Sequence, residues 1–181
     1  DLGSRGLGDV YKRQGYINSK RPNEKEFGLE RLKGVYSELI KKPIAAKTIL
    51  IAGTNGKGST AECLKNFLFS AGFTVGVYTS PHLIHFNERI RINENQICDE
   101  KIVSSFKKIE ECKGKTKLTY FDYATLAAFD IFSEAQLDFA ILEIGIGGKY
   151  DPVNLLDSDI SIITNIAVSY THLTLPTTCS V

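Results

Sequence analysis

The hydrophobic positions of this chain follow two periods, which alternate along its middle part. Over residues 24–41, apolar residues recur every three or four positions, as on one face of an amphipathic helix, and Pro43 ends the pattern. Residues 48–52 are instead continuously apolar and β-branched, which is typical of a strand buried on both faces. The same patterns predict further helices over 59–71, 99–112 and 123–135 and further strands over 73–78, 89–92, 139–143 and 160–164.

This order of elements predicts an α/β fold in which a mostly parallel sheet carries helices on both faces. Residues 89–92 differ, because charged and apolar residues alternate there before Asn93, which predicts an exposed strand or a hairpin. The segments 1–14 and 169–181 lack such patterning. We interpret both as extensions foreign to the domain, with genuine flexible ends as the alternative. We therefore expect the domain to occupy residues 15–168.

Composition and charge are those of an ordinary soluble protein. The 181 residues suffice for one domain with its own core, and 43% are hydrophobic and 24% charged. A net charge of +1 gives no electrostatic reason to expect nucleic acid or a membrane as partner, and no apolar run approaches the roughly 18 residues of a membrane helix. Since the start lacks the apolar core of a signal peptide, we expect a cytoplasmic protein whose four scattered cysteines are free thiols rather than disulfides or zinc ligands.

Residues 53–60, which read GTNGKGST, stand between a predicted strand and a predicted helix, as a phosphate-binding P-loop does. Glycines let backbone N–H groups approach phosphate oxygens, and the helix start adds N–H groups and the positive end of its dipole. Lys57 is positioned to contact the β- and γ-phosphates, and the Ser59 hydroxyl to contact Mg²⁺ or phosphate. The alternative is a strand-to-helix turn with an incidental lysine. The expected ATP contacts are Gly53, Thr54, Asn55, Gly56, Lys57, Gly58, Ser59 and Thr60.

Glu143 ends a predicted buried strand, and open α/β sheets bind ligands at the carboxyl ends of their strands. An ionised carboxylate there needs a cation, for which Mg²⁺ is natural beside nucleotide phosphates; an ion pair with a lysine such as Lys149 is the alternative. The glycine-rich run 145–148 allows close approach of the backbone to a ligand, or else forms a tight turn. His82 and His85 are interpreted as loop or pocket residues, because Mg²⁺ prefers oxygen ligands.

The glycine-rich loop also carries a resemblance to a known family. Gly58 separates Lys57 from Ser59, and GTNGKGS is similar to the loop of the Mur ligase superfamily, whose members join an amino acid to a carboxylate at the expense of ATP. Further along, the chain reads TSPHL from Thr79, FNERI from Phe86, LEIGIGGKYD from Leu142 and ITNI from Ile163. In this order the segments resemble folylpolyglutamate synthases and the related dihydrofolate synthases. The resemblance implies the N-terminal ATPase domain of that family, truncated before a further sheet domain.

The resemblance implies an ATP- and Mg²⁺-dependent ligase that adds L-glutamate to the carboxylate of dihydropteroate or of a folate through an acyl phosphate. It implies Lys57 and Glu143 as catalytic residues, and Ser80 as a Mg²⁺ ligand together with Glu143 and Ser59. The residues that would border the substrate are Thr119, Tyr120, Phe121, Asp122, Tyr150, Asp151 and Pro152, with His82 beside them. Without the family, Phe121 and Tyr150 are better interpreted as core or rim aromatics.

The chain departs from the family pattern at three places. Asp122 stands where glutamate is usual, Lys149 where arginine is usual, and Ser169-Tyr170 where an Asp-His pair is expected. We expect the 181 residues to act on small molecules as a monomer, and to lack ligase activity by themselves because the glutamate site would lie in the further domain. The alternatives are another Mur-type amide ligase and a non-catalytic ATP-binding module.

Overall fold

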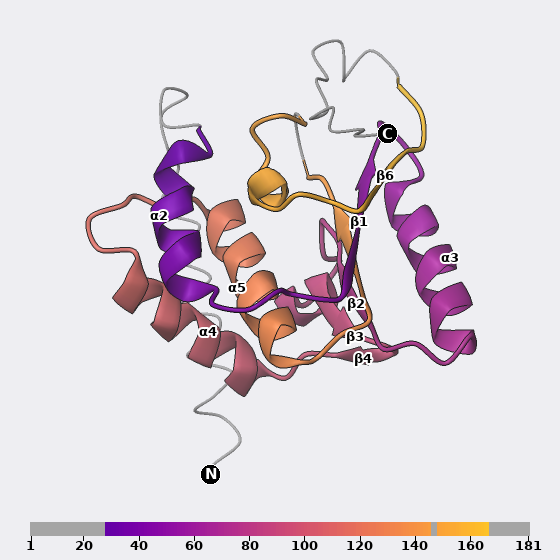
Figure 1. The fold of residues 1–181 in the computed structure, drawn as a ribbon, viewed down its shortest axis with the longest axis horizontal. Coiled ribbons are helices and arrows are strands. Elements are labelled where there is room, and N and C mark those ends of the chain that lie inside the picture. Colours follow the sequence, from indigo (N-terminus) through magenta and orange to yellow (C-terminus); the bar gives the residue numbers. More distant parts are fainter. Residues whose placement is uncertain (1–27, 146–147, 167–181) are drawn as a thin grey trace.

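A mixed β-sheet forms the middle layer of the computed structural model, which describes residues 28–145 and 148–166 (Figure 1). Its strands are β1 (Lys47–Ala52), β2 (Val75–Tyr78), β3 (Ile90–Ile92), β4 (Asn95–Gln96), β5 (Phe139–Glu143) and β6 (Ile160–Ile163). In the described part their order is β4-β3-β2-β5-β1-β6, with β2, β5, β1 and β6 parallel and β3 and β4 antiparallel. The predicted mostly parallel sheet is confirmed, as is the hairpin, which β3 and β4 form. The segments interpreted as foreign, 1–14 and 169–181, lie outside the described residues.

Helices cover both faces of the sheet, as predicted. They are α2 (Glu30–Leu39), α3 (Lys57–Ser70), α4 (Asp99–Cys112) and α5 (Tyr120–Glu134), with the short 3₁₀ helices η2 (Phe86–Arg89) and η3 (Pro152–Leu155). Helix α3 packs on one face, whereas α2, α4 and α5 pack on the other (Figure 1). Within the described ranges, no helix combines the length and the apolar character that crossing a membrane requires.

Strand β1 lies inside the sheet, and its packing explains why it is apolar. Leu50 and Ala52 belong to the larger core between the sheet and helices α2, α4 and α5. Ile49 and Ile51 point the other way and belong to the smaller core under α3. Because both faces are covered, every residue of the strand after Lys47 is buried.

Two helices begin earlier than the sequence patterns predict, for local reasons. Helix α5 begins at Tyr120 because Thr119 caps it: the Thr119 hydroxyl accepts a 3.1 Å hydrogen bond from the Asp122 N–H, and the Asp122 carboxylate accepts one of 2.6 Å from the Thr119 N–H. Helix α3 begins at Lys57, directly after Gly56, which has a left-handed backbone conformation with φ of 79°. Lys57 and Gly58 therefore belong to the first helical turn rather than to the loop before it.

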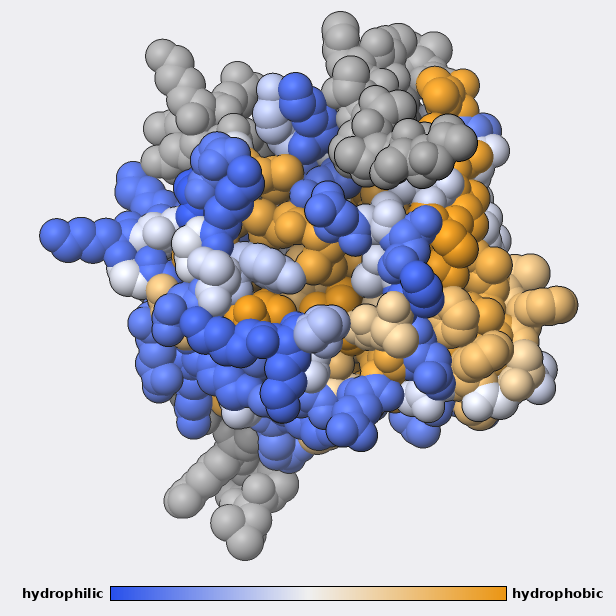
Figure 2. Space-filling model, in the orientation of Figure 1, coloured by the Kyte–Doolittle hydropathy of each residue, from blue (hydrophilic) through white to orange (hydrophobic). Residues whose placement is uncertain are grey.

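Strand β6 is more exposed than its apolar sequence predicts. It pairs with β1 alone among the described strands, and this leaves Ile160 48% and Ile163 40% exposed. A further apolar surface lies on the α3 side of the molecule, where orange colour gathers in Figure 2 and where Phe67, Phe69 and Phe73 are exposed.

Candidate nucleotide-binding site

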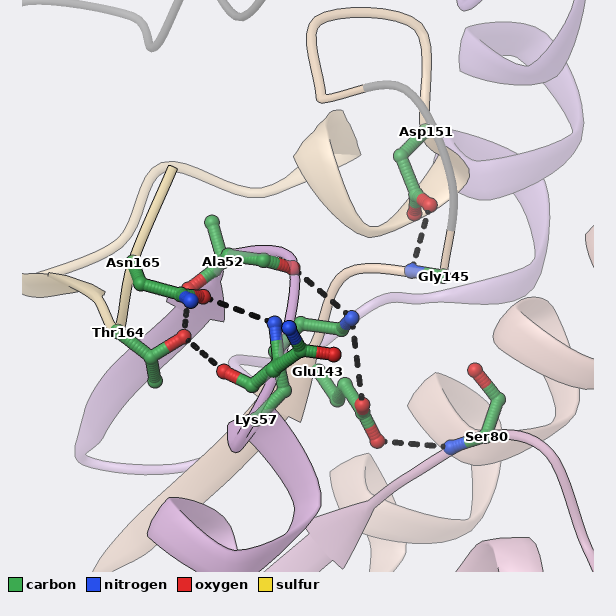
Figure 3. Close-up of polar contacts among 10 residues, drawn as sticks. Ala52, Lys57, Ser80, Glu143, Gly145, Asp151, Thr164 and Asn165 are labelled. Atoms are coloured by element: carbon green, nitrogen blue, oxygen red, sulfur yellow. Dashed lines mark hydrogen bonds and ion pairs between the residues drawn. The ribbon is translucent and has the colours of Figure 1, made fainter. Parts of the chain in front are cut away.

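The register of the parallel strands brings distant segments together at one edge of the sheet. In the pairing of β1 with β5, Ile51 lies opposite Glu143, and in the pairing of β1 with β6, Ala52 lies opposite Ile163. Strand β2 ends beside Leu142 of β5, two residues before Ser80. The glycine-rich loop, Glu143, Ser80 and the residues after β6 therefore meet where the parallel strands end, which is where open α/β sheets bind ligands (Figure 3).

The loop between β1 and α3 has a backbone that glycine makes possible. Gly53 has φ of 137°, and a Cβ atom placed on it would lie 2.0 Å from the Thr164 hydroxyl oxygen. Gly56 precedes the first turn of α3, whose N–H groups have no carbonyl partner within the helix. Around this turn Asn55, Gly56, Gly58 and Ser59 are exposed, so an anion from solvent can reach the helix start.

Two residues after β6 fix the first half of this loop. Asn165 accepts from the Thr54 N–H through its backbone oxygen at 3.0 Å and from the Asn55 N–H through its side-chain oxygen at 2.8 Å. The Thr164 hydroxyl donates to the Asn55 carbonyl at 2.6 Å. The N–H groups of Thr54 and Asn55, which were expected to bind phosphate, thus stabilise the loop by bonding to Asn165. The N–H groups at the start of α3 are better placed to bind a ligand. No role had been predicted for Thr164 or Asn165; the available signal for them was the ITNI segment, which contributed to the family resemblance.

The charged part of the site is the pair Lys57 and Glu143, and Ser80 contacts Glu143 through its backbone N–H (Figure 3). The Lys57 ammonium donates to the Gly53 carbonyl at 2.9 Å and lies 4.0 Å from one carboxylate oxygen of Glu143. The other oxygen accepts a 2.9 Å hydrogen bond from the Ser80 N–H. Burial raises the pKa of Glu143, which is 4% exposed, while the Ser80 hydrogen bond and the charges of Lys57 and Arg89 act in the opposite direction.

The described ion pair of Glu143 is with Lys57, not with Lys149, whose ammonium lies 5.7 Å from the centre of the Tyr150 ring. The residues available to hold a metal supply oxygen: the Glu143 carboxylate and the hydroxyls of Ser80 and Ser59. Nowhere in the described ranges do three or more His, Cys, Asp or Glu side chains gather as metal ligands. One carboxylate and hydroxyls, completed by phosphate oxygens and water, is a set that suits Mg²⁺.

The predicted substrate residues at the start of α5 make contacts within the fold itself. The Phe121 ring lies 6.2 Å from the Tyr78 ring and fills the space beside Gly145, where a Cβ atom would lie 2.4 Å from Phe121 Cζ. Gly145 is therefore required by the packing of an aromatic ring. Thr119 and Asp122 form the helix cap, and Asp122 also pairs with Arg31 at 2.7 Å, so both side chains are occupied by the structure of α5 itself.

The predicted substrate residues after β5 shape the loop in which they lie. One carboxylate oxygen of Asp151 accepts from the Gly145 N–H at 2.8 Å, and the other accepts from the Val153 N–H at 2.9 Å. Asp151 and Pro152 are buried, whereas Tyr150 is exposed. Of these three residues, the Tyr150 side chain is the one that solvent reaches freely.

His82 contacts a residue that the sequence analysis did not single out. Its Nδ1 atom accepts a 2.7 Å hydrogen bond from Nε of Arg89, and Arg89 is only 7% exposed. His85 is exposed, and its N–H donates to Glu88. The alternation of charged and apolar residues over 89–92 had predicted that Arg89 is exposed. The available signal that Arg89 matters was its place in the FNERI segment, which contributed to the family resemblance.

A glycine-rich loop at the end of an inner parallel strand, beside a buried carboxylate at the end of the next strand, defines a nucleotide-binding domain of the P-loop type. The sequence is 41% identical over 157 residues to the dihydrofolate synthase/folylpolyglutamate synthase of Escherichia coli K12, a match that covers 86% of this chain and 37% of that protein. The chain belongs to the dihydrofolate synthase/folylpolyglutamate synthase family, as the resemblance implied. No family model matches the sequence.

Solved structures agree with this assignment. E. coli FolC in complex with DHPP and ADP superposes with a TM-score of 0.85 at 39% identity, over 90% of this chain and 39% of that chain. A bifunctional folylpolyglutamate synthase/dihydrofolate synthase with Mn, AMPPNP and L-glutamate bound gives a TM-score of 0.79 at 42% identity, over 84% and 37% of the two chains. The chain thus spans somewhat over a third of the length of the relatives that it matches.

Proposed function

We propose that this chain forms the ATP-binding part of a ligase that adds L-glutamate to the carboxylate of dihydropteroate or of a folate. The observation that carries the proposal is the position of the Lys57 ammonium, held between the Gly53 carbonyl at 2.9 Å and the Glu143 carboxylate at 4.0 Å beside the glycine-rich loop. The name of the E. coli relative and the ligands of the FolC structure, DHPP and ADP, support the same activity.

In the proposed complex the nucleotide phosphates lie at the start of α3. The first-turn N–H groups and the positive end of the helix dipole favour an anion there. Lys57 moves from the Gly53 carbonyl to the β- and γ-phosphate oxygens, a short displacement because Lys57 itself belongs to that first turn. The hydroxyls of Ser59 and Thr60 lie on the same turn.

Glu143 loses the nearby ammonium of Lys57 when that side chain moves to the phosphates. Because burial raises the pKa of Glu143, another cation beside the carboxylate would favour its ionised form. Magnesium, when bound, supplies that charge and neutralises the phosphate oxygens. Glu143, Ser80 and Ser59 are the residues that would hold it, and the Ser80 N–H keeps the Glu143 carboxylate oriented.

The reaction then proceeds in two steps. A carboxylate oxygen of the acid attacks the γ-phosphorus, so that an acyl phosphate forms while the bond to the ADP oxygen breaks. The amine nitrogen of L-glutamate attacks the acyl carbon, an amide bond forms, phosphate leaves and the amine proton passes to solvent. In the first step Lys57 stabilises negative charge on the transferred group, which is the main contribution a protein makes to phosphoryl transfer.

The test is an assay of the full-length protein that contains this chain. With L-glutamate and either dihydropteroate or tetrahydrofolate, we expect ADP release that requires both the acid and glutamate. No release with either acid would rule the proposal out. Release with only one of them would identify which of the two reactions the protein catalyses.

We further propose that the protein acts in the cytoplasm as a monomer on small molecules. A net charge of +1 supports the choice of small molecules as partners, because it offers no general attraction to nucleic acid or to an anionic membrane. Light scattering of the full-length protein at micromolar concentration is expected to give the mass of one chain.

A further inference from the structure

Arg89 is a buried cation for which the structure describes no ion pair. It ends η2, is 7% exposed, and has no carboxylate within ion-pair distance among the described residues. The other two arginines in the described ranges do have such partners: Arg31 pairs with Asp122 at 2.7 Å, and Arg91 pairs with Glu62 at 2.8 Å. Burying an unpaired charge is costly, so a guanidinium in this position is suited to an anion that none of the described residues provides.

Three side chains hold the Arg89 guanidinium in place. Its Nε donates to Nδ1 of His82 at 2.7 Å. Its central carbon lies 5.3 Å from the centre of the Tyr120 ring and 6.0 Å from that of Phe86. The two rings are themselves in edge-to-face contact, with centroids 6.1 Å apart. The guanidinium is thus oriented before any ligand arrives, which lowers the entropy that binding costs.

His82 acts on Arg89 through one defined atom. A guanidinium carries only donors, so the Nδ1 atom that receives its hydrogen bond is unprotonated. The Nε donor is engaged there, and the edge formed by the two Nη atoms has the spacing that matches a carboxylate. His82 is therefore a positioning residue for Arg89.

The pair lies near the reacting end of the proposed ATP site. His82 follows Ser80, whose N–H holds Glu143. The Arg89 carbonyl accepts a 3.0 Å hydrogen bond from the N–H of Thr79, the residue directly before Ser80. An anion bound at Arg89 would therefore lie at the end of β2, on the side of the sheet edge where Ser80 contacts Glu143.

We propose that Arg89, oriented by His82, binds the carboxylate of the acid that is to be phosphorylated. This inference rests on the proposed function. The acid carboxylate and the γ-phosphate repel each other, and a fixed guanidinium offsets that repulsion while it orients the attacking oxygen. Arg89 is then specific for the acid substrate and has no direct part in binding nucleotide.

The experiment compares two probes by calorimetry on the full-length protein that contains this chain, in the presence of Mg-ADP. The probes are dihydropteroate and its analogue without the carboxyl group. Wild type is expected to bind dihydropteroate more tightly than the analogue. Arg89→Gln lowers the affinity for dihydropteroate roughly 10- to 100-fold, the usual effect of a charged hydrogen-bonding partner, and leaves the affinities for the analogue and for Mg-ADP within about twofold. Arg91→Gln, in the next strand and outside the site, is the matched control and changes none of the three.

Two substitutions of His82 separate positioning from mere space filling. His82→Asn places an amide oxygen where Nδ1 stood, so it preserves the acceptor for Arg89 and is expected to retain most of the affinity for dihydropteroate. His82→Gln carries its amide farther out and is expected to lose about as much affinity as Arg89→Gln. Equal losses of affinity for dihydropteroate in the two variants would contradict the positioning role of His82. Should Arg89→Gln fail to fold by thermal melting, Arg89→Lys keeps the charge without the fork and is expected to show the same selective loss.

The outcomes for Arg89 are distinct. If wild type binds Mg-ADP but does not prefer dihydropteroate over the analogue, the inference is wrong and the proposed function stands. If the Arg89 variants lose Mg-ADP affinity as strongly as acid affinity, Arg89 serves the Glu143 side of the nucleotide site instead, and the inference is again wrong. If wild type does not bind Mg-ADP, the proposed function itself is contradicted.

Discussion

The Ser80 N–H donates a 2.9 Å hydrogen bond to one carboxylate oxygen of Glu143, and the other oxygen of that carboxylate faces the Lys57 ammonium at 4.0 Å. Three segments that are far apart in the sequence are joined by this one side chain. It orients the carboxylate toward the glycine-rich loop, so that changes to Glu143 and to Lys57 should affect nucleotide binding in different ways.

Glu143→Gln keeps the shape of the side chain and the acceptor for Ser80, but removes the charge. We expect Mg²⁺ to strengthen ATP binding much less in this variant, with the gain in affinity reduced by at least about tenfold. Calorimetry with and without Mg²⁺ measures the effect. Glu134→Gln, on the exposed end of α5, is the control and should show the wild-type response to the metal. An unchanged response in Glu143→Gln would place the metal elsewhere.

Lys57→Ala removes the ammonium that we assign to the β- and γ-phosphates. The variant is expected to bind ATP more weakly with or without Mg²⁺, and in the full-length protein turnover should fall by roughly 10²- to 10³-fold. Lys41→Ala removes an exposed lysine that follows α2 and pairs with Glu38, and it serves as the matched control. Wild-type affinity and turnover in Lys57→Ala would refute the assignment.

Gly53→Ala tests the tight contact between the loop and the residues after β6. The added methyl group would meet the Thr164 oxygen at 2.0 Å in a backbone conformation with φ of 137°, so we expect a loss of more than about 1 kcal/mol in unfolding free energy and weaker nucleotide binding. Gly34→Ala, in the exposed face of α2 with no atom within 4 Å, should stabilise the protein by about 0.5–1 kcal/mol. Urea denaturation of both variants provides the comparison.

Glu88 gives a pH-dependent prediction. Its carboxylate accepts hydrogen bonds from the N–H groups of His85 at 2.6 Å, Leu83 at 2.7 Å and Ile84 at 2.9 Å, which lower its pKa from 4.5 to about 2. A lowered pKa in the folded state means that the stabilisation is complete above about 4.5 and is lost as the pH falls toward about 2. The stability difference between wild type and Glu88→Gln should therefore be constant at neutral pH and shrink below pH 4.5. A difference that stays constant down to pH 3 would contradict this account.

The 181-residue chain by itself should bind Mg-ATP without forming amide bonds. The matched relatives are much longer, and this chain spans 37% of the E. coli protein. Calorimetry should detect binding, while an assay with L-glutamate and dihydropteroate should detect no product. Amide formation by the isolated chain would show that the described residues contain the glutamate site as well.

Sequence patterns predicted the helices and strands of this fold better than they predicted which residues of different strands lie side by side. The apolar runs at 48–52 and 139–143 identified β1 and β5 because burial on both faces leaves no room for polar side chains. That β5 lies between β1 and β2, and so places Glu143 beside the glycine-rich loop, follows from strand order and register, which no local pattern encodes. The position of Glu143 at the end of a strand was predictable; its partners were not.

The hardest residues to interpret were those that could serve either the structure of their own helix or strand or a contact with a distant segment. Thr119 and Asp122 lie three apart before an apolar stretch, the spacing of a capping box, and the structure uses them in that way. Arg89 lies in an alternating segment that predicts exposure, yet η2 turns it inward against Phe86 and Tyr120. A period of two shows that neighbouring side chains point in opposite directions, but it does not show which of the two surfaces faces water.

The attachment of the loop to Thr164 and Asn165 links ligand occupancy to β6, the outermost parallel strand among the described residues. Strand β6 pairs with β1 alone in the described sheet and exposes Ile160 and Ile163, a combination that favours unwanted strand-to-strand association between molecules. Any ligand that tightens the loop must, by thermodynamic reciprocity, also make β6 harder to detach. ATP should therefore act on this chain as a protectant against precipitation, even when no chemistry takes place.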